Sequence, residues 1–251
     1  MLGYFDRKYG KNPTVNLFPL QARYGLQTMP SEINNAFMEF TRAREFIIRK
    51  LTRELKPSLF YHNAQHTLDV IRSVETLALM EKVDDGKLLL LLTAALYHDT
   101  GYLWSYENNE PLARDFAEET LPAFGYSDKQ IREIGRLILS TAMPQRPENL
   151  LEEILCDADL DYVGRDDFFI TALRLHREWS ENSPLKISFR DWYERQRDFI
   201  EWHEFFTPSA RLLRNEKKKK NLTQVKELLD LIETTSPFGQ KKINGIKNRF
   251  L

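Results

Sequence analysis

The chain has 251 residues, of which 42% are hydrophobic and 29% charged, with a net charge of −1 and a single cysteine. This length can bury a sizeable core, and the balanced charge gives no general attraction to nucleic acid or to an anionic membrane surface. One cysteine excludes an intrachain disulfide and fits a reducing cytosol. No apolar run reaches the roughly 18 residues needed to cross a bilayer, so we expect a globular cytoplasmic protein.

The first part of the chain changes character after residue 30. Glycine and proline interrupt residues 1–29, which predicts an irregular arm. Ser31 can then cap a long helix, which we expect to end at Pro57. Asn63 is a candidate N-cap for the helix that follows. The N-terminal part is therefore expected to be an arm and one long helix that pack on the rest of the molecule.

A Leu-rich stretch then leads to the pair His98-Asp99. One of the residues Asp84 and Asp85 can cap this helix, and because the helix is apolar on nearly every face, we expect it at the centre of the fold. Few segments alternate with a period of two, which favours an all-α fold. Apolar residues at helical spacing predict further helices over residues 107–121, 127–138, 148–164, 166–179, 188–206, 208–220 and 223–233.

Three of the five histidines lie in two short motifs. His62 and His66 are four residues apart, so they can share one face of a helix. His98 and Asp99 follow the Leu-rich run, where burying them is costly unless a charged group compensates. Imidazole and carboxylate both suit a divalent cation as ligands. The two motifs therefore predict a metal site.

A third motif, residues 156–161, offers more carboxylates beside an apolar run. Asp157 and Asp159 are two residues apart, so only one of them readily faces a given site. Asp161 is expected to cap a helix or to face solvent. Cys156 is expected to be a small core residue rather than a nucleophile.

Taken in order, these motifs resemble those of the HD superfamily of metal-dependent phosphohydrolases. Residues 61–70, Tyr-His-Asn-x-x-His-x-x-Asp-Val, resemble a signature of class I cyclic-nucleotide phosphodiesterases, and residues 158–160 resemble their later Ala-Asp-Leu. The resemblance implies an all-α HD-domain helical bundle whose metal site lies between central helices. We divide the chain accordingly into the N-terminal arm and long helix, the HD core, and the basic C-terminal helices and tail (residues 1–56, 57–210 and 211–251).

The same resemblance implies roles for individual residues. It makes His62 the general acid, and it places the carboxylate of Glu110 beside a bridging water, although the macrodipole explains a glutamate in a first helical turn equally well. One or two ions of manganese, iron, zinc or magnesium are expected. The implied metal ligands are His66, His98, Asp99 and Asp159, with Asp157 as the alternative to Asp159, and the implied orienting residues are Asn63 and Asp69.

The function implied is attack of metal-activated water on a phosphate ester, with a nucleotide phosphodiester as the first choice of substrate. A nucleotide monophosphatase or pyrophosphohydrolase is the alternative, and a non-catalytic module that binds nucleotide or protein is the alternative of another class. The expected partner is a small phosphorylated molecule; membrane and nucleic acid are not expected, and an oligomer is compatible with this interpretation. Residues 217–220 are four consecutive lysines. We interpret this basic run most simply as a solvated helix end, rather than as a contact for phosphate-rich partners.

Overall fold

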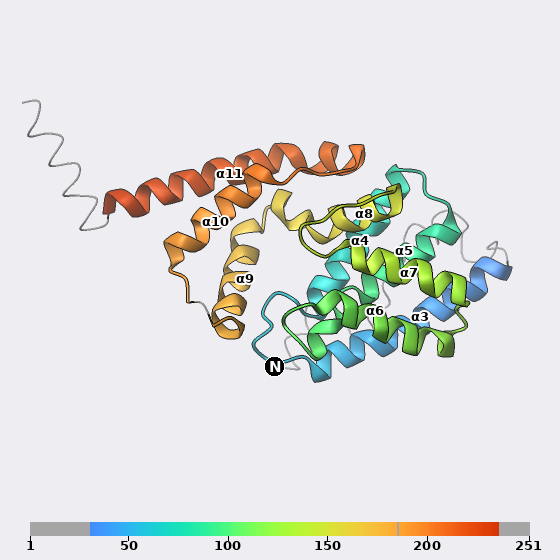
Figure 1. Cartoon of the computed structure of the whole chain (residues 1–251). Coiled ribbons are helices and arrows are strands. Elements are labelled where there is room, and N and C mark those ends of the chain that lie inside the picture. Colours follow the sequence, from blue (N-terminus) through green and yellow to red (C-terminus); the bar gives the residue numbers. More distant parts are fainter. Residues whose placement is uncertain (1–30, 185, 236–251) are drawn as a thin grey trace, which may run out of the picture.

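The computed structural model describes residues 31–184 and 186–235, and every regular element in that part of the chain is a helix, as the sequence predicts (Figure 1). The arm expected over residues 1–29 lies outside the described residues. No helix in the described ranges has the length and apolar composition needed to cross a membrane. The helices are α3 Ser31–Glu54, α4 Ala64–Met80, α5 Asp85–Tyr97, η1 Thr100–Leu103, α6 Asn109–Thr120, η2 Leu121–Phe124, α7 Asp128–Ser140, α8 Leu150–Asp159, η3 Asp161–Gly164, α9 Phe168–Asn182, α10 Phe189–Trp202 and α11 Pro208–Thr235, where η denotes a 3₁₀ helix.

Helix α5 is the centre of the larger part of the molecule. Every residue from Leu88 to Tyr97 is buried, and α5 packs against α3, α4, α7 and α8 (Figure 1). A helix that is apolar all round has to be surrounded, because each exposed leucine side chain would forfeit about 1.5–3 kcal/mol of burial. The central position predicted for this helix is confirmed.

Side-chain caps fix where three of the helices begin. The side chain of Asn63 accepts hydrogen bonds from the backbone N–H groups of Gln65 and His66, so it caps α4. Asp84 caps α5 through the N–H of Lys87, and Ser127 begins a capping box at α7. These starts follow the predicted ones, because a cap depends only on residues within one helical turn.

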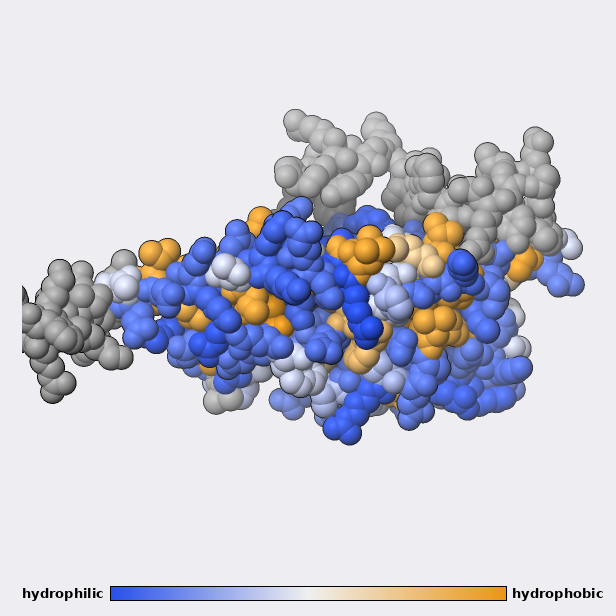
Figure 2. Space-filling model, turned by 90° about the horizontal axis from the view of Figure 1, so that it is seen from above, coloured by the Kyte–Doolittle hydropathy of each residue, from blue (hydrophilic) through white to orange (hydrophobic). Residues whose placement is uncertain are grey.

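A second apolar cluster joins η3 with the last three helices. Figure 1 shows α11 leading away from the body formed by α3–α8, with α9 and α10 beside it. On the face seen in Figure 2, exposed apolar side chains occur in separate patches among hydrophilic ones. The buried residues of the second cluster are Tyr162, Val163, Phe168, Ala172, Trp192, Tyr193, Ile200, Val225 and Leu229.

The end of the chain differs from the sequence-based prediction in one respect. The two segments expected over residues 208–220 and 223–233 form the single helix α11. Asn221, at the expected interruption, is buried, and its side-chain amide donates hydrogen bonds to the carbonyl oxygens of Val163 and Arg165, each at 3.0 Å. Tertiary hydrogen bonds thus hold a weak helix former inside the helix.

The basic run of α11 lies mid-helix and is mostly engaged by the protein itself, so the expectation of a helix end is wrong. Lys217 pairs with Asp166, and Lys218 donates to the backbone carbonyl of His203. Lys220 pairs with Glu216 one turn earlier on the same helix. Lys219 and Lys220 are exposed, so this part of the run is solvated, as the sequence predicts.

Candidate metal centre

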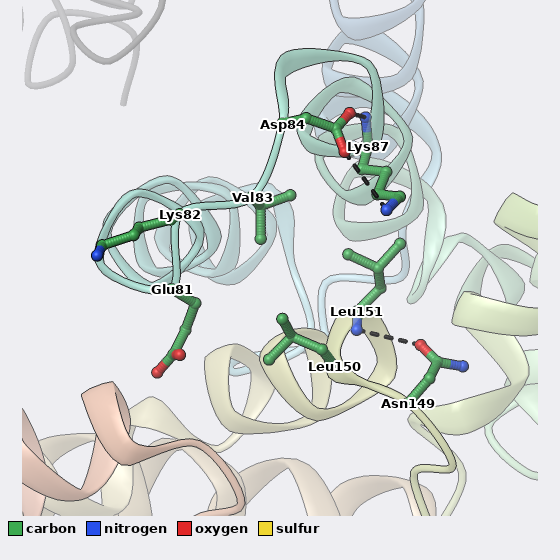
Figure 3. A pocket seen from close by; sticks show the side chains of 8 residues that line it. All are labelled: Glu81, Lys82, Val83, Asp84, Lys87, Asn149, Leu150 and Leu151. Atoms are coloured by element: carbon green, nitrogen blue, oxygen red, sulfur yellow. Dashed lines mark hydrogen bonds and ion pairs between the residues drawn. The ribbon is translucent and has the colours of Figure 1, made fainter.

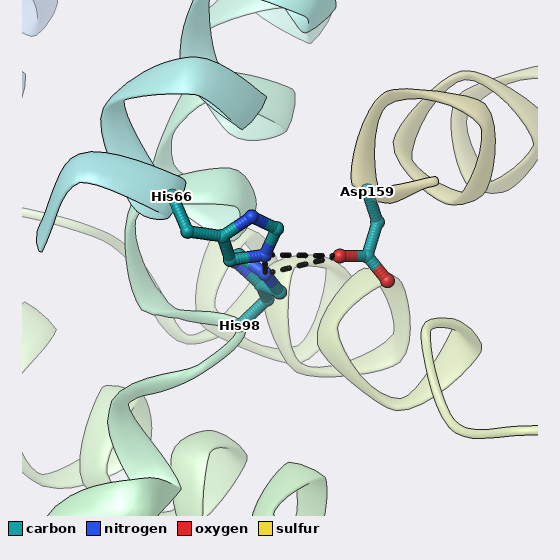
Figure 4. Close-up of side chains that lie close together, drawn as sticks. All are labelled: His66, His98 and Asp159. Carbon is teal, nitrogen blue, oxygen red and sulfur yellow. Dashed lines mark hydrogen bonds and ion pairs between the residues drawn. The ribbon is translucent and has the colours of Figure 1, made fainter. Parts of the chain in front are cut away.

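The ends of three helices meet at a cluster of two histidines and one aspartate (Figure 4). His66 lies in the first turn of α4, His98 directly follows α5, and Asp159 is the last residue of α8. The two Nε2 atoms are 3.3 Å apart, and Oδ1 of Asp159 lies 3.2 Å from Nε2 of His66 and 3.5 Å from Nε2 of His98. The three side chains could hold one metal ion.

Asp99 brings a second carboxylate to the same histidines. Its Oδ2 atom is 3.2 Å from Nε2 of His66 and 3.2 Å from Nε2 of His98. This oxygen is buried, yet none of the described residues makes a well-directed hydrogen bond to it. Ligand atoms bound at about 2.1 Å to one ion are themselves about 3.0–3.4 Å apart. Both the separations and the unsatisfied oxygen therefore fit a cation.

Neighbouring groups orient the cluster. Nδ1 of His98 donates to the carbonyl of Ala95 at 2.8 Å, which leaves the Nε2 lone pair facing the cluster. The amide of the buried Gln145 donates to Oδ2 of Asp159 at 3.2 Å, which leaves Oδ1 facing the histidines. Gln145 was not predicted, because nothing in its loop sequence marks it as a partner of Asp159.

The cluster is electrostatically tightly coupled. Burial lowers the pKa of His98, but Asp99 and Asp159 more than compensate and hold that pKa well above its usual value. The pKa of His66 is raised through the same balance. Burial alone would raise the pKa of Asp99, but the neighbouring histidines bring it well below its ordinary value. A bound cation would take the place of the imidazole protons beside these carboxylates, because a metal is held by neutral histidine and ionised aspartate.

His62 lies beside the cluster and is held by a carboxylate from α9. Its Nδ1 atom contacts Oε1 of Glu178, and the N–H groups of Tyr61 and His62 donate to Oε2 at 2.8 and 3.0 Å. The side chain of Glu178 is fully buried. The imidazole rings of His62 and His66 are 5.8 Å apart, centre to centre. His62 is thus fixed next to the candidate ligands, with Nδ1 engaged by Glu178.

The sequence does contain a signal for Glu178, although the motifs do not include it. Phe168, Thr171, Leu175 and Glu178 recur at helical spacing along the inner face of α9. A glutamate on an otherwise apolar stripe is costly to bury without partners. That pattern could have marked Glu178 as a functional candidate. It could not have identified His62 as the partner of Glu178, because the two residues are 116 positions apart.

Asp157 points to a different part of the molecule from Asp159. Its carboxylate accepts hydrogen bonds from the N–H groups of Phe206 and Thr207, both at 2.8 Å, and from the Thr207 hydroxyl at 2.7 Å. Asp157 thus braces the turn before α11, and the histidines meet Asp159 instead. Asp161, expected to cap a helix or face solvent, is buried and binds Arg214 at 2.5 and 3.1 Å. That expectation is wrong because α11 passes directly over η3.

The remaining predicted site residues lie around the cluster. Glu110 begins α6 half-buried, and burial together with the charges of Asp99 and Asp159 raises its pKa. Asn63 acts on His66 only through the backbone, by capping α4. Asp69 contacts Gln65, Arg72 and Arg165.

Histidines supply the positive charges that act most strongly on the carboxylates of the cluster. Arg165 is a nearby cation, and its charge influences Tyr61. However, Arg165 binds Asp167 and lies within 4.0 Å of the carboxylates of Asp69 and Asp161. Its charge is therefore largely neutralised by the protein.

A cavity of about 350 Å³ lies at the opposite end of the same helices (Figure 3). It is lined by the end of α4, the start of α5 and the start of α8, including Lys82, Lys87 and Leu150. Along α5, Lys87 and His98 are separated by about 16 Å of helix. None of the predicted site residues lines this cavity, so it is separate from the metal centre.

Comparisons with known proteins identify the family of the central part of the chain and the likeness of its fold. Residues 63–162 match the HD domain family, whereas no curated protein matches the chain. The crystal structure of a predicted HD superfamily hydrolase from an uncultured Thermotogales bacterium is similar, with 19% sequence identity over 76% of this chain and 91% of that one and a TM-score of 0.52. At this identity the likeness concerns the fold, and the narrower likeness to cyclic-nucleotide phosphodiesterases stays a prediction. The resemblance read from the motifs is confirmed at the level of the HD domain: residues 63–162 of this chain match that family.

Proposed function

We propose that the protein is a metal-dependent phosphohydrolase that cleaves a phosphodiester, most simply one of a nucleotide. The observation that carries this proposal is the convergence of Asp99 and Asp159 on the Nε2 atoms of His66 and His98, at 3.2–3.5 Å. These four residues would hold one or two divalent cations. When bound, such a cation acts as a Lewis acid toward a phosphoryl oxygen and lowers the pKa of water.

The residues around the cluster would contribute positioning and proton transfer. His62 would deliver a proton from Nε2 toward the leaving-group oxygen, as histidine commonly does in general acid catalysis. Glu178 would act as a positioning residue, because its contacts with Nδ1 and with two backbone N–H groups fix the direction of Nε2. Glu110, half-buried near Asp99, would orient a water molecule.

The charge around the cluster favours a diester over a monoester. A phosphodiester carries one negative charge, whereas a phosphate monoester carries up to two at neutral pH. Asp99, Asp159, Glu110 and Glu178 already bring four carboxylates to this region, and the nearby Arg165 is occupied by Asp167. A substrate with a single charge meets less repulsion from these carboxylates.

Metal loading followed by a hydrolysis assay tests the proposal. Protein loaded with manganese, iron, zinc or magnesium is expected to cleave bis-p-nitrophenyl phosphate faster than p-nitrophenyl phosphate. His98→Ala should lose both the metal and the cleavage. His176→Ala, at a histidine whose ring packs on Trp192 away from the cluster, should keep both.

Three results would contradict the proposal. A folded wild-type protein that binds no metal and cleaves neither ester would leave the non-catalytic binding module as the better function. Cleavage that survives in folded His98→Ala would remove the cluster from the reaction. Preference for the monoester would keep the hydrolase but overturn the choice of a diester.

A further inference from the structure

Tyr102 contacts the atom of His62 from which the proton would leave. Its ring stacks on the imidazole, with centroids 4.3 Å apart and planes inclined by 23°. Its hydroxyl oxygen is 3.3 Å from Nε2. Tyr102 belongs to η1, the short helix that follows Asp99, and it lies outside the sequence motifs that predict the metal site.

We propose that the hydroxyl of Tyr102 is a catalytic proton relay between Nε2 of His62 and the leaving-group oxygen of the substrate. This inference rests on the proposed function and adds a residue to it. A hydroxyl suits the task because it can accept one hydrogen bond and donate another at the same time. Glu178, His62 and Tyr102 then form one continuous chain from a buried carboxylate to the substrate.

The contacts of the two ring nitrogens of His62 determine from which of them a proton can leave toward the substrate. Nδ1 faces the carboxylate oxygen Oε1 of Glu178, so we assign the hydrogen of that bond to Nδ1. Nε2 is the remaining ring nitrogen, and it faces the hydroxyl of Tyr102. A proton that leaves Nε2 therefore meets this oxygen first.

The relay balances without any additional reactant. As the bond between phosphorus and the leaving oxygen breaks, its electron pair stays on that oxygen, which takes the hydroxyl proton of Tyr102. The tyrosine oxygen takes the proton of His62 Nε2 in the same event. Tyr102 ends as it began, His62 ends neutral, and the leaving group departs as an alcohol.

The surroundings of Tyr102 keep the hydroxyl protonated and in place. Burial and the charges of Asp99 and Glu178 raise its pKa well above the ordinary tyrosine value, so a free phenolate does not accumulate and the two transfers are coupled. Gly101 packs directly on α6, where a Cβ atom would lie 1.9 Å from the carbonyl oxygen of Asn109. The backbone N–H of Tyr102 also donates to the carbonyl of Asp99 at 3.2 Å.

The test compares two substrates whose leaving groups differ in their need for a proton. Tyr102→Phe keeps the stacked ring and removes only the hydroxyl. With a dinucleotide, whose alkoxide leaving group needs protonation, kcat is expected to fall about 100-fold. With bis-p-nitrophenyl phosphate, whose leaving group is stable as an anion, kcat should change less than about threefold. Tyr126→Phe, which removes a hydroxyl bonded to Thr93 at 2.8 Å, serves as the matched control and should leave both rates unchanged.

A double variant separates a relay from an unrelated effect. If His62 and Tyr102 act in one chain, His62→Ala combined with Tyr102→Phe should be no slower on the dinucleotide than His62→Ala alone. The inference is overturned if Tyr102→Phe leaves both rates unchanged, lowers both equally, or adds its full loss to that of His62→Ala. If the wild type binds metal but cleaves neither substrate, the proposed function falls and the relay falls with it. If the wild type is active and only the Tyr102→Phe pattern fails, the relay alone is lost.

Discussion

At the scale of single residues, two aspartates on α8 have separate tasks although they are two positions apart. Asp159 directs Oδ1 at His66 and His98, while Asp157 accepts three hydrogen bonds from Phe206 and Thr207. Positions i and i+2 of a helix project in different directions, so one faces the cluster and the other faces the turn before α11. The two roles can be tested separately, because Asp159 contacts the histidines and Asp157 does not.

Asparagine at either position should therefore give opposite results. Asp159→Asn is expected to weaken metal binding at least tenfold, because a charged ligand is lost. Asp157→Asn should keep metal affinity within about threefold but lower the free energy of unfolding by about 1–3 kcal/mol, because a buried N–H or hydroxyl loses its acceptor. Metal titration calorimetry and urea unfolding measure the two effects. Loss of metal binding in Asp157→Asn, with none in Asp159→Asn, would reverse the assignment.

At the scale of elements, a buried arginine of α3 and a buried glutamate of α4 influence each other's pKa without forming a direct ion pair among the described contacts. Arg44 and Glu75 are both buried, and Nε of Arg44 and Oε1 of Glu75 have no hydrogen-bond partner among the described residues. Burial raises the pKa of Glu75 from 4.5 to about 7, against the opposing influence of Arg44 and Arg72. The folded state thus binds a proton at Glu75 more tightly than the unfolded chain does.

This difference predicts how stability changes with pH. Because the folded pKa lies above the unfolded one, the contribution of Glu75 is fully present below about pH 4.5 and is lost as the pH rises through about 7, by at most about 3 kcal/mol. In Glu75→Gln, the free energy of unfolding should change less between pH 5 and pH 8 than in the wild type. Glu45→Gln, at an exposed glutamate next to Arg44, should keep the wild-type slope. Equal slopes in all three proteins would show that Glu75 titrates normally.

At the scale of the whole molecule, side chains link the two apolar cores. The match to the HD family ends at residue 162 and includes all four candidate ligands, but Glu178 comes from α9, in the second core. Within the second core, Asp161 and Arg214 join η3 to α11. Helix α9, which lies beyond the matched HD domain, therefore contributes a side chain to the surroundings of the candidate site.

Breaking the pair of Asp161 and Arg214 should measure how strongly η3 and α11 are coupled within the second core. Arg214→Ala leaves the carboxylate of Asp161 buried without its main partner, so we expect the free energy of unfolding to fall by about 2–3 kcal/mol. With Asp161→Asn as the second change, a double-mutant cycle should give a coupling energy of at least about 1 kcal/mol. Arg190→Ala, which breaks an exposed pair with Glu194, should cost less than about 1 kcal/mol. Additive effects of the two changes would show that the pair contributes no coupling.

The sequence by itself determined the helices, the central place of α5 and the motifs that identify an HD domain. Caps such as Asn63 and Ser127 depend on neighbours within one turn, and apolar periodicity depends on neighbours within a few turns, so both can be read locally. Only the tertiary structure decided that Asp159 rather than Asp157 meets the histidines, that Glu178 holds His62, and that α11 covers Asp161. These contacts join residues 50 or more positions apart, and their geometry follows from how whole helices pack, which no short stretch of sequence specifies.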